Sequence, residues 1–293
     1  MKGFAALALT AVTAACLSAT AARAEGDEFS TCVARLWPQA RAKGVSQDTF
    51  DRAFQGVTMD PDVLAAARRQ PEFVKPIWEY LDSAVSDSRI ANGRAKAAEW
   101  AQALEAIERS YGVDRHVVLA IWGMESSYGA ILDNPKVVKP VIRSLATLAC
   151  GDPDRAGFGQ QQLVAALQIL QRGDVSLERM TGSWAGAMGH TQFIPTTFLA
   201  HAADFDRDGK RDIWGTVPDA LASTANYLKQ SGWRTGEPWG YEVELPPRFD
   251  YALADETTAR PVSESVRMGI RRAGGGAFAL ALERSSLILP AGV

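Results

Sequence analysis

The sequence lacks several features that would define other classes of protein. Its 31 Lys and Arg residues against 34 Asp and Glu residues give a formal net charge of −3. There is no excess of positive charge with which to hold the phosphates of a nucleic acid. Three His and three Cys residues are too few, and too scattered, for a zinc framework. We therefore expect neither a nucleic-acid partner nor a zinc framework.

Long hydrophobic runs are also absent after the first residues. A membrane-spanning helix needs about 20 apolar residues, whereas the longest later run, Val117 to Met124, predicts a short buried helix. The sequence contains no internal repeat and no low-complexity linker. Hydrophobic residues make up 47% and charged residues 22% of 293 residues, the balance of a globular protein with a sizeable core.

The first 24 residues have the pattern of a secretory signal peptide. Lys2 supplies the positive start, Phe4 to Leu17 is a short apolar stretch, and Ala22-Arg23-Ala24 places small residues where a signal peptidase reads them. Cys16 allows an alternative, an outer-membrane lipoprotein, but Thr13 stands where a lipoprotein signal usually has Leu. We expect export to the periplasm and favour the unlipidated form.

Two cysteines, Cys32 and Cys150, follow the predicted signal peptide. In an oxidising compartment an isolated pair is more often a disulfide than a nucleophile. Closing so long a loop would add about 4–5 kcal/mol in the chain-entropy model. Two separate buried thiols are the alternative. No Cys–His catalytic pair is apparent.

Most of the chain is predicted to be helical. Asp60-Pro61 is a typical start, a capping residue followed by Pro at the first helical position. An apolar periodic segment stops at Gly112, and Asp114 then caps the apolar helix that follows. Pro218-Asp219 opens a further helix, which Gly232 closes.

The character of the sequence changes after Gly236. Tyr241 to Leu245 alternates like a strand, Pro246-Pro247 breaks the pattern, and Val266 to Ile270 is a candidate second strand. We therefore predict four segments: a signal peptide at 1–24, an N-terminal helical domain at 25–100, a helical core at 101–235 and a small β-containing appendage at 236–293.

The most informative residue is Glu125. It closes the apolar run Val117 to Met124, which supplies no neighbouring cation. Desolvation penalises the charged form, so a carboxyl in such a place tends to keep its proton near neutral pH. A general acid needs that proton to protonate the departing oxygen of a glycosidic bond. The plain alternative is a Glu that ends a buried helix with its head in solvent.

A second informative segment runs from Gly182 to Pro195. Three Gly and two Ala residues in this stretch allow the backbone to approach a ligand closely. Gln192 offers both a donor and an acceptor, which suits sugar hydroxyls and acetamido groups. The alternative is a tight helix–helix crossing that needs small residues.

Trp122 to Gly129 and Gly182 to Pro195 together resemble the motifs of the lytic murein transglycosylase B family, glycoside hydrolase family 103. The resemblance spans most of the chain after the predicted signal peptide. Further matching segments occur in the same order, namely Arg69 to Phe73, Ser144 to Leu148, Asp204 to Gly209 and Ala225 to Leu228.

The resemblance implies a mainly α fold, with a lysozyme-like helical core, a flanking helical domain and a small β-containing C-terminal appendage. It implies cleavage of the β-1,4 bond between N-acetylmuramic acid and N-acetylglucosamine in peptidoglycan. Glu125 matches the single catalytic Glu, first an acid and then a base toward the muramic acid 6-hydroxyl, whose attack forms a 1,6-anhydro ring. The substrate's acetamido oxygen stabilises the anomeric centre, so no second carboxylate is required, unlike the usual scheme.

The resemblance also implies a sugar groove lined by Tyr80, Arg155, Phe158, Ser183, Gln192 and Tyr227. The tyrosines would present flat faces to sugar rings, while Ser183 and Gln192 would form hydrogen bonds. Phe158 stands where the family often has Tyr, which removes a hydroxyl contact. Asp154 replaces a basic residue that often precedes Arg155. Burial in a helical core is the alternative for both tyrosines.

Asp204-x-Asp206-x-Asp208-Gly209 is the start of an EF-hand-type calcium loop. Alternating carboxylates converge on the ion, and Lys210 would offer its backbone carbonyl. Gly215 stands where the usual twelfth-position Glu would be, and the family's variant loop closes later, which points to Asp219, with Asp212 also available. We expect a weakly bound structural Ca²⁺ and no cofactor for catalysis. A solvated acidic turn is the alternative.

Members of the family usually continue past Leu287 to Pro290 with a strand and helix that complete the groove. This sequence stops at Val293, so the resemblance predicts that the appendage is truncated. It also predicts lower stability or activity than in a full-length relative. A lysozyme-type hydrolase and a catalytically impaired peptidoglycan-binding protein are the alternative functions. We expect a monomer that binds peptidoglycan glycan strands, with proteins of cell-wall synthesis or remodelling as further candidate partners.

Overall fold

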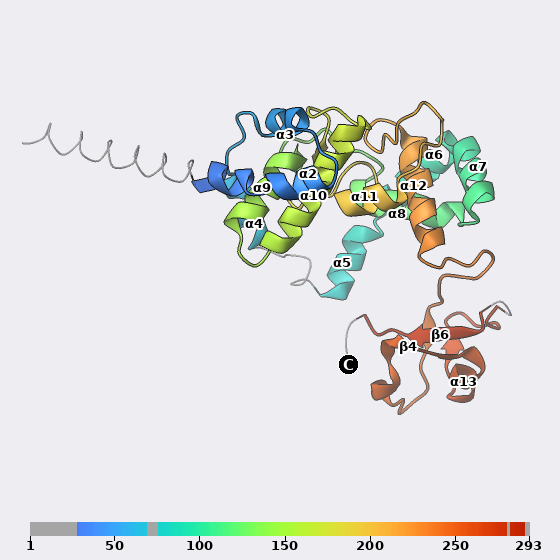
Figure 1. Ribbon diagram of the computed structural model, residues 1–293. Coiled ribbons are helices and arrows are strands. Elements are labelled where there is room, and N and C mark those ends of the chain that lie inside the picture. The colour runs from blue at the N-terminus through green and yellow to red at the C-terminus, as the bar shows by residue number, and fades with distance from the viewer. Residues whose placement is uncertain (1–27, 69–75, 280–281, 291–293) are drawn as a thin grey trace, which may run out of the picture.

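The computed structural model describes residues 28–68, 76–279 and 282–290. Within them a helical body leads through a connecting segment into a smaller C-terminal unit of short strands and α13, which lies to one side of the body (Figure 1). The predicted signal peptide, Cys16 and the whole Arg69 to Phe73 motif lie outside the described residues.

Helices dominate the body, which confirms the predicted fold class. None of the helices in the described ranges combines the length and apolar character that a bilayer span requires. In chain order the body contains α2 (Trp37–Ala42), α3 (Gln47–Phe54), α4 (Pro61–Ala67), α5 (Ile77–Ala84), α6 (Asp87–Glu99), α7 (Ala101–Tyr111), α8 (Arg115–Ser126), β1 (Lys139–Pro140), α9 (Val141–Gly151), α10 (Ala156–Arg172), β2 (Thr181–Gly182), α11 (Pro195–His201) and α12 (Val217–Gln230).

The helix boundaries follow local capping chemistry. The Asp60 side chain accepts a hydrogen bond from the Asp62 N–H at the start of α4. Gly112 ends α7 in the left-handed region, with φ of 73°, where the absence of a Cβ removes the steric penalty. The Asp114 carboxylate accepts from the His116 N–H at 2.7 Å and begins α8. These three predictions are confirmed.

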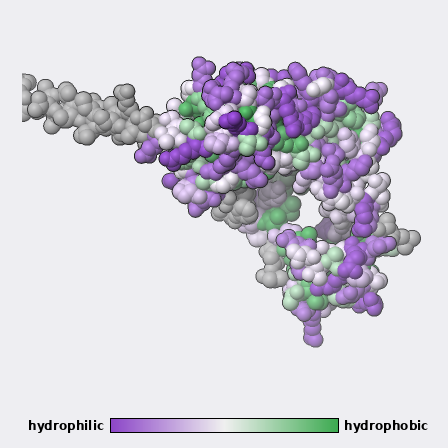
Figure 2. All heavy atoms as spheres, in the orientation of Figure 1, coloured by the Kyte–Doolittle hydropathy of each residue, from purple (hydrophilic) through white to green (hydrophobic). Residues whose placement is uncertain are grey.

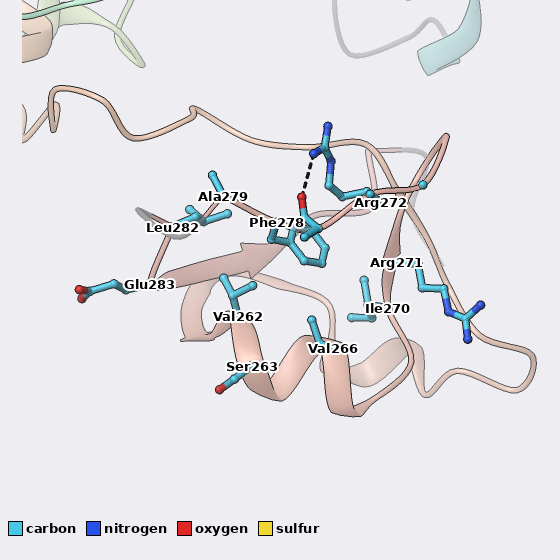
Figure 3. Close-up of a pocket in the computed structure, with 13 residues that line it drawn as sticks. Val262, Ser263, Val266, Ile270, Arg271, Arg272, Phe278, Ala279, Leu282 and Glu283 are labelled. Atoms are coloured by element: carbon cyan, nitrogen blue, oxygen red, sulfur yellow. Dashed lines mark hydrogen bonds between the residues drawn. The ribbon is translucent and has the colours of Figure 1, made fainter.

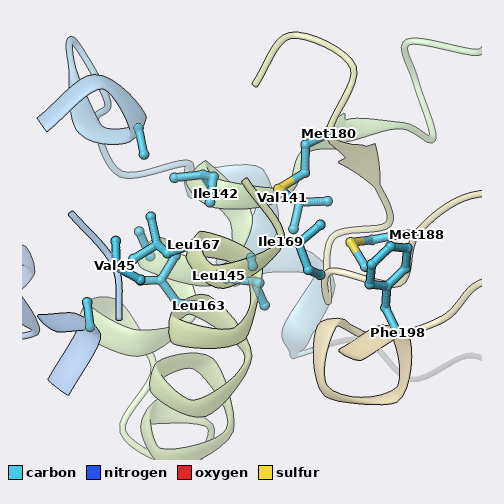
Figure 4. Packing of buried hydrophobic residues seen from close by; sticks show 14 of the residues in the cluster. Val45, Val141, Ile142, Leu145, Leu163, Leu167, Ile169, Met180, Met188 and Phe198 are labelled. Atoms are coloured by element: carbon cyan, nitrogen blue, oxygen red, sulfur yellow. The ribbon is translucent and has the colours of Figure 1, made fainter. Parts of the chain in front are cut away.

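The larger hydrophobic cluster joins the N-terminal helices to the middle of the chain. Figure 4 shows how α9 and α10 bring their buried faces together, with Val45 on one side and Phe198 of α11 on the other. A disulfide between Cys32 and Cys150 links the N-terminal segment to the end of α9 across 118 residues. Central members of the cluster are Val141, Ile142, Leu145, Leu163, Leu167 and Ile169.

A second cluster lies between α7, α8 and α12. It is formed by side chains such as Leu104, Val118, Trp122 and Leu221, all of them buried. Residues on both sides of position 100 contribute to each cluster, since Ala97 and Trp100 pack on the second and Phe29 to Ala53 on the first. The division into domains at 25–100, 101–235 and 236–293 stays a prediction.

The C-terminal unit contains two small antiparallel pairs. β3 (Val243–Glu244) pairs with β5 (Arg271–Arg272), and β4 (Asp255–Pro261) pairs with β6 (Arg284–Leu287). The strand predicted over Tyr241 to Leu245 is therefore confirmed for its central two residues.

The second predicted strand, Val266 to Ile270, is wrong. Val266 belongs to α13 (Val262–Arg267), and Gly269 turns the chain with φ of 88°. Pro261 precedes the helix and Glu264 lies in its first turn, where an acidic side chain is favoured by the helix dipole. These helix-start signals outweigh the β-branched residues that suggested a strand.

Candidate active site

Glu125 lies in the last turn of α8, between the exposed Met124 and the buried Ser126. Its side chain reaches solvent, yet the surrounding protein raises the pKa of the carboxyl above its ordinary value, and partial desolvation is the cause. Within the described part of the chain, no cation forms an ion pair with Glu125. The direction of this shift is the one that desolvation of a carboxyl produces.

The backbone after Glu125 makes an unusual turn. Ser127, Tyr128 and Gly129 all have positive φ, at 51°, 61° and 88°. Two non-glycine residues in succession in this region are costly and persist only when the surroundings hold them. The Tyr128 ring packs back on Trp122, with centroids 5.6 Å apart, and a Cβ on Gly123 would lie only 2.5 Å from that ring. The end of α8 is therefore tightly constrained.

The turn and α8 contact the Gly182 to Pro195 segment through His190. The Trp122 indole Nε1 donates to His190 Nδ1 at 3.0 Å, and the Ser126 hydroxyl donates to the His190 carbonyl at 2.6 Å. Gly129 lies against the imidazole, because a Cβ there would come within 2.5 Å of His190 Cε1. The two segments that the sequence singled out therefore meet through Trp122, Ser126 and Gly129, which flank Glu125 in the sequence.

The glycines of the Gly182 to Pro195 segment mainly allow the loop to fold on itself. The Ser183 N–H donates to the Ala187 carbonyl at 2.7 Å, and a Cβ on Gly182 would lie 2.2 Å from that same carbonyl oxygen. Met188 and Phe193 exchange backbone hydrogen bonds and bury their side chains in the core. The close approaches are backbone to backbone within the loop and against neighbouring elements.

The polar groups predicted to bind sugar are partly used within this loop. Ser183 Oγ accepts from the N–H groups of Ala185 and Ala187, at 3.2 and 3.1 Å. Gln192 has a φ of 53° and its Nε2 donates to the Gly189 carbonyl at 2.9 Å. These bonds leave the Ser183 hydroxyl proton, the Gln192 carbonyl oxygen and the second Gln192 amide proton for a ligand.

Arg155 lies against this loop. The Arg155 guanidinium pairs with Asp152 at 3.3 Å and lies over the Trp184 ring, 5.9 Å from its centroid. Trp184 directly follows Ser183, so Arg155 and Ser183 belong to one neighbourhood. Phe158, on α10, is 36% exposed.

Both tyrosines predicted to contact sugar are accessible, so the alternative of core burial is wrong. Tyr227 is 40% exposed on α12, and its ring contacts Phe193 and His201 edge-on. Tyr80 is 42% exposed on α5, the helix between the body and the C-terminal unit in Figure 1. Figure 2 shows hydrophobic surface in this region, and Leu81 on the same helix is 48% exposed.

Three carboxylates converge in the predicted calcium loop. Oxygens of Asp204, Asp206 and Asp219 lie within 4.8 Å of one another. Asp219 is fully buried. Burial, with a smaller effect of Asp206, raises its pKa to about 6, although N–H groups of Phe205 and Asp212 donate to it. An all-oxygen set with converging negative charge fits a hard divalent cation.

The other predicted ligands occupy different positions. Asp208 is outside the converging set, and its Oδ1 accepts from the Lys210 N–H at 2.8 Å. Asp212 pairs with Arg179 at 3.0 Å and accepts from backbone N–H groups at the following turn. Asp219, and not Asp212, belongs to the converging set.

Sequence reasoning assigned no role to His190. It is one of only three His residues, and it lies within the Gly182 to Pro195 segment, which is a weak signal. Its indole partner is 68 residues away in sequence, so the contact has no local signature.

A cavity of about 730 Å³ lies in the C-terminal unit (Figure 3). Val262, Val266, Ile270 and Phe278 form much of its wall, while the Arg272 side chain donates to the Ala277 carbonyl at 2.8 Å. None of the predicted site residues lines this cavity.

Solved structures show which class of protein has this fold. SltB3 from Pseudomonas aeruginosa, solved with NAG-anhNAM-pentapeptide, matches with a TM-score of 0.83 and 52% identity over 89% of this chain and 69% of SltB3. SltB1 from the same organism matches at 0.73 and 32% identity, over 82% and 80% of the two chains. Escherichia coli Slt35 matches at 0.73 and 22% identity over 92% and 82%, which supports the fold alone. The fold is the lysozyme-like fold of the lytic transglycosylases.

The sequence model of the transglycosylase SLT domain matches residues 28–293, so the chain belongs to this family. Membrane-bound lytic murein transglycosylase B of Escherichia coli is 29% identical over 180 residues, which are 61% of this chain. The match spans about half, 48%, of that relative. The predicted resemblance to the lytic murein transglycosylase B family is confirmed.

Proposed function

We propose that this protein is a peptidoglycan lytic transglycosylase that cleaves the β-1,4 bond between N-acetylmuramic acid and N-acetylglucosamine. The observation that carries the proposal is Glu125 itself. It is an accessible carboxyl with a raised pKa and no cationic partner among the described residues, next to a loop held by His190. The 52% identity with SltB3, solved with an anhydro-muropeptide and with NAG-NAM-pentapeptide, supports the reaction and substrate class.

In this mechanism, Glu125 donates its proton to the glycosidic oxygen as the C1–O bond breaks. The N-acetyl oxygen of the substrate stabilises the anomeric carbon, which replaces the second carboxylate of most glycosidases. Glu125, now ionised, removes the proton from the muramic acid 6-hydroxyl. The 6-oxygen then bonds to C1, giving a 1,6-anhydro ring and returning the proton to Glu125.

We further propose that the accessible tyrosines, Tyr80 and Tyr227, stack against sugar rings. The Ser183 hydroxyl proton, and the carbonyl oxygen and second amide proton of Gln192, are available for sugar hydroxyls and acetamido groups. Arg155 supplies a charge near Ser183, and Phe158 supplies an apolar contact. The exposure of Tyr80, Phe158 and Tyr227 supports these roles. The contacts of Tyr227 with Phe193 and of Arg155 with Trp184 support them for the residues beside the loop.

A calcium ion held by Asp204, Asp206 and Asp219 is proposed as a structural element. When bound, the ion neutralises the converging carboxylates and holds the loop before α12. Asp208 and the Lys210 carbonyl would need to turn inward to join it. The converging carboxylate oxygens support this proposal, and no catalytic step depends on the ion.

The cellular setting is proposed from the sequence pattern. Residues 1–24 would direct export to the periplasm, where peptidoglycan is accessible. The Cys32–Cys150 disulfide is compatible with an oxidising compartment. A monomeric state and contacts with cell-wall synthesis or remodelling proteins stay predictions.

The decisive experiment compares wild type with Glu125→Gln on purified peptidoglycan and analyses the soluble products by mass spectrometry. A transglycosylase releases 1,6-anhydro muropeptides, which are lighter by one water than hydrolysis products. Release of only the hydrated products would establish a lysozyme-type hydrolase instead. Binding to peptidoglycan with no product from wild type would establish a non-catalytic binding protein.

A further inference from the structure

We propose that His190 is a positioning residue for catalysis. It ties the end of α8, and with it Glu125, to the Gly182 to Pro195 loop that carries Ser183 and Gln192. The inference rests on the proposed function, because it concerns the placement of the proposed acid against the proposed sugar-binding loop.

Two hydrogen bonds reach His190 from α8, and a third joins one of their donors to the turn after the helix. Trp122 Nε1 donates to the ring at 3.0 Å, and the Ser126 hydroxyl donates to the backbone carbonyl at 2.6 Å. The same hydroxyl accepts from the Gly129 N–H at 2.9 Å. Trp122 and Ser126 are one helical turn apart, so they share a face, and Glu125 lies between them in sequence.

The hydrogen-bond pattern selects one form of the imidazole. The Trp122 indole is only a donor, so Nδ1 of His190 accepts and carries no proton, which leaves the proton on Nε2. Burial, with a contribution from Lys96, lowers the pKa of His190 and outweighs the opposite effects of Asp212 and Asp133. The hydrogen bond from Trp122 favours the neutral ring, because a doubly protonated imidazole would place two N–H groups against each other.

On the loop side, His190 is held by the backbone. Its N–H donates to the Ile213 carbonyl at 3.0 Å. Gly189 packs so closely on Ile213 that a Cβ would lie 2.4 Å from the same oxygen. Gln192 follows two residues later and folds back on Gly189. A shift of the imidazole would therefore move Gln192 relative to Glu125.

The consequence is a catalytic rather than a binding defect when the ring contact is lost. General acid catalysis depends on the distance from the proton donor to the departing oxygen, and displacement by about 1 Å costs up to about a hundredfold in rate. Substrate binding is spread over several groove residues and changes less. The expected signature is a fall in kcat with little change in KM.

The test uses His190→Leu, which removes the acceptor, and His190→Asn, whose Oδ1 is placed to accept from Trp122. Trp122→Phe removes the donor and retains a ring. His116→Leu is the matched control, since His116 is an exposed His near the start of α8. Rates of anhydro-muropeptide release give kcat and KM, and thermal unfolding followed by circular dichroism checks the fold.

We expect kcat to fall about ten- to a hundredfold in His190→Leu, with KM within about twofold, and to be largely restored in His190→Asn. Trp122→Phe should lower kcat similarly, and the double variant should show no further loss. Wild-type kcat in a folded His190→Leu, or in Trp122→Phe if His190→Leu does not fold, would overturn the inference. So would equal defects in His190→Leu and His190→Asn. Absence of product from wild type would instead overturn the proposed function.

Discussion

Glu125 and Asp219 are both carboxyls whose pKa is raised by the fold, yet their surroundings suit them to opposite tasks. Glu125 is accessible, and desolvation is the cause of its shift. Asp219 is fully buried, accepts two backbone N–H groups and faces Asp206. An isolated acid that retains its proton can donate it to a substrate. A bound cation reduces the electrostatic repulsion between clustered carboxylates.

The comparison teaches that a raised pKa does not identify the chemistry of a site. Desolvation disfavours the ion in both places. The deciding features are the neighbours: none of the described charged groups pairs with Glu125, whereas Asp204 and Asp206 converge on Asp219.

The largest expected effect tests the role of Glu125. Replacing it with Gln removes the transferable proton while nearly preserving shape, and we expect the rate to fall by at least about a hundredfold. The measurement is the initial rate of muropeptide release. Glu105→Gln, which alters an exposed ion-paired Glu on α7, should leave the rate unchanged. Equal rates for wild type and Glu125→Gln would exclude Glu125 as the acid.

Asp219→Ala should lower the free energy of unfolding and not only the rate of the reaction. The substitution leaves the N–H groups of Phe205 and Asp212 without their acceptor, and each such loss costs about 1–3 kcal/mol. Urea unfolding measures the difference from wild type. Asp208→Ala, at an exposed position, is the control and should cost less. If Asp219→Ala is as stable as wild type, the Asp219 carboxylate has no structural role.

Calcium removal should lower the unfolding temperature. Ligand binding to the folded state adds about 2.7 kcal/mol when free calcium is a hundredfold above Kd, so chelation reverses a stabilisation of that order. Thermal unfolding with calcium and with chelator gives the shift. Asp206→Asn should abolish most of it and Asp208→Asn less, since Asp206 belongs to the converging set. The reverse ranking would contradict the proposed ligands.

The smallest effect is a displaced pH dependence. Because burial raises the pKa of Glu125 above its model-compound value of 4.5, the acid stays protonated to a higher pH. Activity requires that proton, so it is retained below the folded-state pKa and falls as pH rises through it. The descending limb of kcat/KM against pH should therefore have its midpoint above 4.5. A midpoint at or below that value would show that the site does not raise the pKa of Glu125.

Much of the helical body could be predicted because capping acts over a few residues. Asp60 and Asp114 accept hydrogen bonds from free N–H groups in the first turn of their helices. Gly112 ends its helix with a left-handed backbone conformation. The strand predicted over Val266 to Ile270 was wrong because β propensity is expressed only when a partner strand is present. The chain instead begins a helix after Pro261, and Val266 lies within that helix.

The candidate site was predictable only in part. Glu125 stands out because an acid at the end of an apolar run is unusual, and the spacing of Asp204 and Asp206 indicates converging carboxylates. The exposure of Tyr80 and Tyr227, and the use of Ser183 Oγ inside its own loop, depend on packing that the sequence pattern does not encode.

The sequence by itself determined several helix ends, the position of the solitary Glu125 and the position of the acidic loop. Each of these features depends on residues that are close together in the sequence. Tertiary structure decided which distant groups meet, such as Trp122 with His190 across 68 residues. The Cys32–Cys150 disulfide was predicted because only two cysteines follow the predicted signal peptide, and the structure confirms it. The physical reason is that local hydrogen bonds follow from chain geometry. Long-range partners are selected only when burial of the whole core brings their elements together.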